Sequence, residues 1–155
     1  MVTVSDGVTE GTREDLSGAA LAGLLEDDGY EVERQVVPDD REAIAGTLER
    51  LAAVSDLVLT TGGTGFGPRD VTPEATRQVV DREAPGLAEA IRADARAKTP
   101  HGMLSRGLAG IAGRCVVVNL PGSPGGARDG YAAIRDALPH AVKLLAGETT
   151  THRQT

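Results

Sequence analysis

Residues 56–75 read DLVLTTGGTGFGPRDVTPEA, and this stretch decides the fold class. Its apolar start, which ends at Thr61, is typical of a buried strand, and four glycines follow in the next six residues. Thr72, Pro73 and Glu74 then supply a capping hydroxyl, a first-turn proline and an acid near the helix dipole, which predicts a helix with Thr72 as its N-cap. A strand, a glycine loop and a helix in this order form the repeating unit of a parallel α/β sheet.

The same alternation extends over most of the 155 residues. Val2–Val4, Val32–Val37 and Arg114–Leu120 are further strand patterns, and helix-spaced leucines, isoleucines and alanines lie between them. We therefore predict an α/β fold over residues 1–147: a single three-layer domain with a mostly parallel, doubly wound sheet and helices on both faces. The polar residues 148–155 are expected to form a disordered tail.

Short signals predict where some of the helices begin and end. Gly29 fits the position after a helix C-terminus, and Pro139 is expected to kink or divide the last helix. Asp39 and Glu42 have the spacing of a capping box, which would make Asp39 the N-cap of the following helix.

The composition argues against several classes of function. A formal net charge of −7 disfavours a nucleic-acid partner, and a chain without Trp, with one Phe and two Tyr, offers few platforms for base stacking. Backbone amides can still bind a small anion. The single Cys115 cannot form an intramolecular disulfide, and its apolar run predicts a buried side chain. No apolar run approaches a membrane span and a strand pattern begins at Val2, so we expect a cytoplasmic protein without a signal peptide.

Loops rich in glycine, serine or threonine follow three of the predicted strands. They are Ser5–Gly7, Thr60–Gly67 and Pro121–Gly126. Because ligands bind beyond the carboxyl ends of parallel strands, we expect the three loops to converge on one edge of the sheet.

The loop Thr60–Gly67 carries the strongest chemical signal. Its glycines allow positive φ angles and close approach to a ligand, and its amides and threonine hydroxyls can bind an anion such as phosphate. It lacks the Gly-Lys-Ser/Thr ending of a P-loop and the spacing of a dinucleotide-binding fingerprint. The alternative is a flexible turn that only connects the strand to the helix.

Two carboxylates are expected near this loop. Asp70 stands between the loop and the next helix, and Asp39 follows the strand pattern that ends at Val37. Together they could hold Mg²⁺ against bound phosphates. The alternatives are a solvated acid or a partner of Arg69 for Asp70, and the helix cap for Asp39.

Ser105 and Arg106 lie in a glycine-flanked, partly apolar segment. Arg106 could bind phosphate through two parallel hydrogen bonds, or it could form a surface salt bridge. The histidines at positions 101, 140 and 152 lack metal-ligand spacing, and no Ser/His/Asp or Cys/His arrangement is suggested.

Taken together, these segments resemble the MoaB/Mog family of molybdenum cofactor biosynthesis proteins. The glycine loop followed by PRDVTPEA, residues 68–75, carries most of the resemblance. Further matching segments are Val4–Asp6, Asp15–Gly18, Val37–Asp40, Met103–Arg106 and Asn119–Pro124. The resemblance runs from about residue 2 to residue 147.

The resemblance implies Mg-ATP-dependent adenylylation of molybdopterin with release of pyrophosphate. It also implies a homotrimer that hands its product to a separate molybdenum-insertion protein. Asp70 and Asp39 match the acids of catalysis and Mg²⁺ binding. The implied substrate-binding residues are Ser5, Asp6, Ser17, Gly18, Thr61, Gly62, Gly63, Thr64, Gly65, Ser105, Arg106, Asn119, Pro121, Gly122, Ser123 and Pro124.

Two other functions stay open on the sequence alone. The chain could be a non-catalytic molybdopterin-binding or scaffold paralogue, or it could hydrolyse a different nucleotide, since similar domains occur in pyrophosphatase-like proteins. The presence of Asp39, Asp70 and Ser105 favours the adenylyltransferase.

Overall fold

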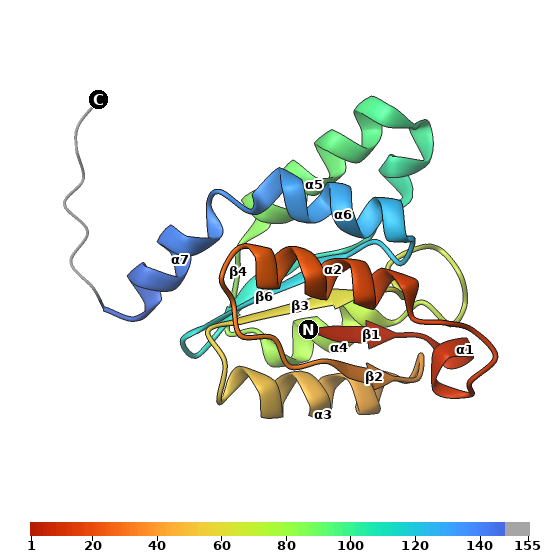
Figure 1. Cartoon of the computed structure of the whole chain (residues 1–155), viewed down its shortest axis with the longest axis horizontal. Helices are drawn as coiled ribbons and strands as arrows, with labels where there is room; N and C mark the ends of the chain where they lie inside the picture. The colour runs from red at the N-terminus through yellow and green to blue at the C-terminus, as the bar shows by residue number, and fades with distance from the viewer. Residues whose placement is uncertain (148–155) are drawn as a thin grey trace.

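In the computed structural model, which describes residues 1–147, four adjacent parallel strands run inward from one edge of a six-stranded sheet (Figure 1). They are β1 (Val2–Val4), β2 (Gln35–Val37), β3 (Leu57–Thr61) and β6 (Cys115–Leu120), in the spatial order β2-β1-β3-β6. The chain passes from β1 to β2 on one side and then returns to β3 on the other side of β1. The predicted doubly wound sheet is therefore confirmed, with a topological switch point between β1 and β3.

Two short strands that the sequence pattern did not predict extend the sheet beyond β6. β5 (Ala109–Ala112) pairs antiparallel with β6, and β4 (Arg82–Glu83) pairs antiparallel with β5. The β5 run, AGIA, has weak strand propensity. A two-residue hairpin turn aligns it with β6, and the φ of +59° at Gly113 suits the first position of a type II′ turn.

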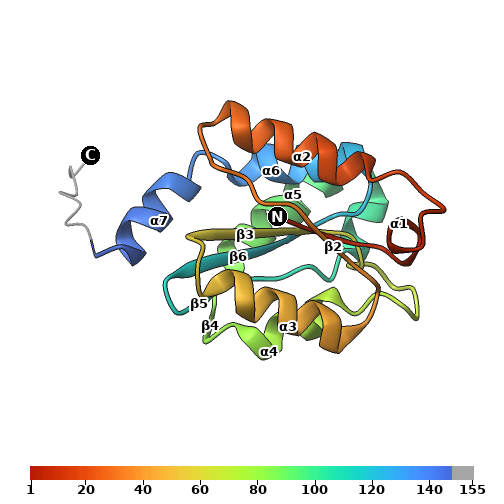
Figure 2. The same cartoon turned by 60° about the horizontal axis from the view of Figure 1, so that its bottom comes forward.

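Helices cover both faces of the sheet, as predicted (Figure 2). One face carries α2 (Leu16–Asp27), α5 (Pro85–Lys98) and α6 (Pro124–Ile134). The other face carries α3 (Arg41–Ala52) and α4 (Thr72–Val79). The remaining elements are α1 (Asp6–Thr9), the 3₁₀ helix η1 (Pro100–Leu104) and α7 (Leu138–Leu145). Among the helices of residues 1–147, none has the length and apolarity to cross a membrane.

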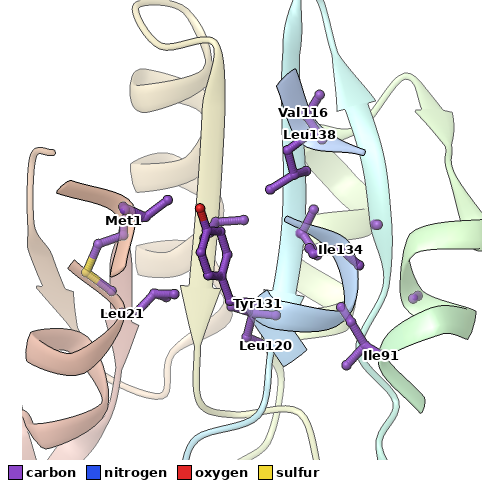
Figure 3. Packing of buried hydrophobic residues seen from close by; sticks show 13 residues of the cluster. Met1, Leu21, Ile91, Val116, Leu120, Tyr131, Ile134 and Leu138 are labelled. Atoms are coloured by element: carbon purple, nitrogen blue, oxygen red, sulfur yellow. The ribbon is translucent and has the colours of Figure 1, made fainter. Parts of the chain in front are cut away.

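The alternation of side chains along the strands builds two hydrophobic cores. On β6, Val116 and Val118 face α2, α5 and α6, whereas Cys115 and Val117 face α3 and α4. Figure 3 shows the first core, where side chains from α2, α5 and α6 gather over the sheet. Burial of each such aliphatic side chain is worth roughly 1.5–3 kcal/mol. Cys115 is buried, as predicted, and burial raises the pKa of its thiol to about 11.

Two predicted helix boundaries are confirmed. Gly29 follows α2 with a φ of +87°, and its amide donates to Glu26 O while the amide of Tyr30 donates to Leu25 O. This is the Schellman pattern of hydrogen bonds that a glycine permits. Pro139 lies in the first turn of α7, so the C-terminal helical pattern is divided in two. The tail predicted for residues 148–155 lies outside the described residues.

Two predicted N-caps are wrong. Asp40, and not Asp39, caps α3, because its carboxylate accepts the amide of Ala43 at 2.9 Å. Thr72 is the first residue of α4 rather than its N-cap, and its hydroxyl donates to the carbonyl of Gly62 at 2.9 Å. In both cases the side chain expected to close a helix points toward the neighbouring loops instead.

Candidate functional site

The carboxyl ends of β1, β2, β3 and β6 lie at the same edge of the sheet, and the three predicted loops meet there (Figure 1). A cavity of about 690 Å³ opens between them, at the switch point between β1 and β3. The predicted site residues that line it are Ser5, Ser17, Asp39, Thr61, Gly62, Gly63, Asp70, Gly122, Ser123 and Pro124. The loops therefore converge as predicted, whereas the roles of the single residues stay predictions.

The start of the glycine loop is packed too closely for any other residue. Gly62 has a φ of +106°, and a Cβ there would lie 2.2 Å from the carbonyl oxygen of Val4. Gly63 has a φ of +65°, and a Cβ would lie 2.3 Å from Oγ1 of Thr72 and 3.2 Å from Oδ1 of Asp39. These contacts fix the loop between β1 and α4, which favours a binding loop over a flexible connection.

Arg106 holds the rest of the loop in place. Its Nε donates to Gly65 O at 2.7 Å, its Nη2 donates to Asp70 O at 2.6 Å, and its guanidinium forms an ion pair with Glu74. The Arg106 amide also donates to Thr64 O at 2.8 Å. The ion pair keeps the pKa of Glu74 below its ordinary value. Arg106 thus binds the loop and α4 and does not line the cavity, so the salt-bridge alternative describes its geometry.

Asp39 and Asp70 face the same cavity from neighbouring loops. Partial burial raises the pKa of Asp39, and the negative charges of Asp6 and Asp70 raise it further, while the amide of Asp6 acts in the opposite direction. One oxygen of Asp70, Oδ2, accepts the amide of Gly67 at 2.9 Å. Arg69 pairs with Asp6 and not with Asp70, which removes one alternative for Asp70. The rim therefore concentrates negative charge that a cation would offset.

Several predicted site residues do not line the cavity: Asp6, Gly18, Thr64, Gly65, Ser105, Arg106, Asn119 and Pro121. Asn119 is buried, and its side-chain amide donates to the hydroxyls of Thr60 and Thr76 at 3.0 and 2.9 Å. A Cβ at Gly18 would lie 2.2 Å from a carboxylate oxygen of Asp15, so this glycine serves packing. Asn119 and Gly18 thus act in hydrogen bonding and packing within the protein.

The structure adds cavity residues that the sequence did not suggest. They are Thr3, Val4, Val8, Arg13, Glu14 and Leu16. Val8, Arg13 and Glu14 belong to α1 and the loop after it, and this helix of four residues is too short for a periodic signal. The position of α1 at the cavity depends on hydrogen bonds between Asp6 and Asp39, which are distant in the sequence and therefore leave no local pattern.

A second cavity, of about 470 Å³, lies at the opposite ends of the strands, near Met1, Asp56 and Leu57. None of the predicted site residues lines it. Within residues 1–147, no three His, Cys, Asp or Glu side chains gather where they could hold a metal ion. A metal at the first cavity would therefore rely on few protein ligands.

Comparison with known proteins agrees with this architecture. A family model described as "Probable molybdopterin binding domain" matches residues 1–140. The molybdopterin adenylyltransferase of Helicobacter pylori J99 is 37% identical over 95% of this chain and 86% of its own length. The crystal structure of the molybdopterin biosynthesis enzyme MoaB from Thermus thermophilus superposes with a TM-score of 0.89 at 46% identity, over 97% of this chain and 96% of that chain.

One relative is a much longer protein. The molybdenum cofactor synthesis protein cinnamon of Drosophila melanogaster is 39% identical over 100% of this chain, which spans only 26% of the Drosophila protein. The family model, the relatives of similar length and the shared fold agree over nearly all of the described residues. The chain belongs to the MoaB/Mog family of molybdenum cofactor biosynthesis proteins.

Proposed function

We propose that the protein adenylylates molybdopterin with ATP and releases pyrophosphate. The observation that carries the proposal is the shared cavity in which Asp39 and Asp70 face the glycine loop and the N-terminus of α6. Such a site combines carboxylates for a metal ion with backbone groups for phosphates. Relatives of similar length that are named molybdopterin adenylyltransferase support the assignment.

The residues at the rim fit a Mg²⁺ ion that is bound together with a nucleotide. Mg²⁺ prefers oxygen ligands and is commonly held by one or two carboxylates plus substrate phosphates rather than by an all-protein cage. Asp39 and Asp70 match that donor set. Burial first, and then the negative charges of Asp6 and Asp70, raise the pKa of Asp39, and a divalent cation would offset those charges. When bound, Mg²⁺ would offset the negative charge of the phosphates.

The reaction we propose is an in-line transfer. An oxygen of the terminal phosphate of molybdopterin forms a bond to the α-phosphorus of ATP, and the bond to the pyrophosphate oxygen breaks with its electron pair on the leaving group. A phosphate monoester is already anionic at pH 7, so the mechanism needs no general base. The task of the protein is positioning and electrostatic stabilisation, as in other phosphoryl-type transfers.

Two parts of the chain would position the phosphates. α6 has 11 residues and begins at the cavity, with Ser123 as its N-cap, so its dipole favours an anion there. The backbone at Gly63, whose carbonyl accepts the amide of Thr72 at 3.1 Å, offers a second anchoring point. Both are held by hydrogen bonds within the protein, which would lower the cost of ordering the site around a substrate.

Product analysis tests the proposal. Purified protein with Mg-ATP and molybdopterin should yield adenylylated molybdopterin and an equal amount of pyrophosphate. Asp70→Ala should abolish turnover, and Asp40→Ala, which removes only the cap of α3, should retain it. Full turnover by Asp70→Ala would contradict the role of this acid. Tight molybdopterin binding without pyrophosphate release would instead identify a binding paralogue.

We also propose that the protein is a cytoplasmic homotrimer that passes its product to a molybdenum-insertion protein. A relative named molybdenum cofactor biosynthesis bifunctional protein, from Chlorobaculum tepidum, supports the second point: it is 36% identical, and this chain covers 48% of it. Exposed apolar side chains at Val54, Phe66 and Met103 offer surface for contacts between copies. Light scattering would measure the oligomeric state, and a monomeric mass would exclude the trimer.

A further inference from the structure

The charge that lines the cavity is unbalanced. Glu14, Asp39 and Asp70 contribute carboxylates, whereas Arg13 is the one basic side chain in the lining. Molybdopterin and ATP both carry phosphate groups, which three carboxylates repel. A metal ion at Asp39 and Asp70 would offset only the charge next to those two acids. The N-terminus of α6 and the loop amides carry only partial positive charge, so a full positive charge from a side chain would strengthen phosphate binding elsewhere in the cavity.

The two other arginines at the rim already have partners. Arg69 donates to both carboxylate oxygens of Asp6 at 2.9 to 3.1 Å. Arg106 binds Glu74 and the carbonyls of the glycine loop. The Arg13 guanidinium, in contrast, has no hydrogen-bond or ion-pair acceptor among residues 1–147. Its charge is thus available to a ligand.

The backbone and the aliphatic part of Arg13 are held against α1. The Arg13 amide donates to the carbonyl of Gly7 at 3.0 Å. A Cβ added at Gly7 would lie 3.0 Å from Cδ of Arg13, so the absence of a side chain at residue 7 leaves room for the arginine. Ser5, the N-cap of α1, also lines the cavity. Arg13 is exposed and lines the cavity, and its packing against Gly7 restricts the aliphatic part of the side chain, so part of its conformational freedom is already lost.

We propose that Arg13 binds a phosphate group of the substrate, a role that rests on the proposed function. A guanidinium stays charged at any working pH and can donate two parallel hydrogen bonds to phosphate oxygens. The nucleotide and the pterin both carry phosphate oxygens that a guanidinium can bind, so either could supply this phosphate. Binding measurements with each ligand separately identify the source.

Calorimetry on the full chain tests the inference, with Mg-ATP and molybdopterin titrated in separate experiments. Arg13→Gln should weaken the binding of one ligand by about tenfold, the scale of a lost charge-assisted hydrogen bond, and leave the melting temperature unchanged. Arg13→Lys should recover part of the affinity, since it keeps the charge but loses the planar fork. Arg82→Gln, an exposed arginine on β4 at the far edge of the sheet, should bind both ligands normally.

Wild-type affinity of Arg13→Gln for both ligands would overturn the inference, and so would failure of the wild-type protein to bind either of them. An equal loss of affinity and melting temperature in both Arg13 variants would assign the residue a structural role instead. Since binding is measured without turnover, the outcome is separate from that of the proposed function. Ligand binding that depends on Arg13, without pyrophosphate release, would uphold the inference and reject the enzymatic activity.

Discussion

Asp6 and Asp39 accept each other's backbone amides. The amide of Asp6 donates to Oδ2 of Asp39, and the amide of Asp39 donates to Oδ1 of Asp6, each at 2.9 Å. Arg69, which follows the glycine loop, donates to the same carboxylate of Asp6. One acid outside the cavity lining thereby joins the loops that follow β1, β2 and β3.

This relationship predicts that Asp6 acts as a positioning residue for Asp39. Asp6→Ala removes the acceptor of the Asp39 amide and the partner of Arg69, so we expect kcat/KM to fall about tenfold, the scale of lost hydrogen bonds to a charged group. The affinity for Mg²⁺ in the presence of ATP should fall as well, which isothermal titration would measure. Asp40→Ala is the matched control: loss of a helix cap costs about 1 kcal/mol of stability. Unchanged metal affinity in Asp6→Ala would show that Asp39 needs no such support.

Gly63 should not tolerate a side chain. Gly63→Ala combines a φ of +65° with a Cβ only 2.3 Å from Oγ1 of Thr72, so we expect a loss of about 2–4 kcal/mol in the free energy of unfolding, from strain and overpacking together. Urea denaturation would measure it. Gly46→Ala, in the open interior of α3, should instead gain about 0.5–1 kcal/mol. Equal stabilities of the two variants would contradict the packing argument.

Even a conservative substitution of Arg106 should weaken the attachment of the glycine loop. Arg106→Lys keeps the charge but cannot donate to Gly65, Asp70 and Glu74 at once, so the glycine loop loses its anchor. We expect a higher KM for ATP and faster amide exchange at residues 62–70, measured by hydrogen exchange. Glu74→Gln, which leaves the carbonyl contacts in place, should have a smaller effect because a half-exposed ion pair contributes little. Slow exchange in Arg106→Lys, as in the wild type, would contradict the anchoring role.

The raised pKa of Asp39 predicts a dependence of stability on pH. Burial and the charges of Asp6 and Asp70 disfavour its ionised form in the folded protein. Its stabilising contribution is therefore complete below the pKa of the unfolded chain and is lost as pH rises through the higher folded pKa. The stability of Asp39→Asn relative to the wild type should therefore increase as the pH rises from about 3.5 to about 7, a range that includes the ordinary Asp pKa of about 3.9. Urea denaturation at both pH values would measure the difference, and a constant difference would contradict the shift.

The strand and helix patterns were predictable because burial imposes periodicity on the sequence. β6 alternates its side chains between two cores, and the leucines of α2 and α3 recur at helical spacing. β4 and β5 were not predictable, because a two-residue strand and the run AGIA carry no periodic signal. The pairing of β5 with β6 and the turn at Gly113 stabilise them.

At the candidate site, too, part of the structure was predictable from the sequence and part was not. The composition of the glycine loop alone indicated an anion-binding loop at a strand end, because glycines allow close approach to a ligand and threonine hydroxyls can bind an anion, with a flexible turn as the alternative. The cap of α3 was misplaced by one residue, because Asp39 and Asp40 have the same capping chemistry. The tertiary structure distinguishes them: Asp39 exchanges hydrogen bonds with Asp6, and Asp40 accepts the amide of Ala43.

The sequence by itself determined the doubly wound α/β domain, the convergence of three loops and the family resemblance, because each is encoded locally as a periodicity, a turn or a motif. Tertiary structure alone decided which side chains face the cavity. In the folded protein Arg106 donates to carbonyls of the glycine loop and Arg69 donates to Asp6, whereas the Arg13 guanidinium has no partner among residues 1–147. The physical reason is that a charged side chain pairs with whatever the fold brings within hydrogen-bond distance, and those neighbours are distant in the chain.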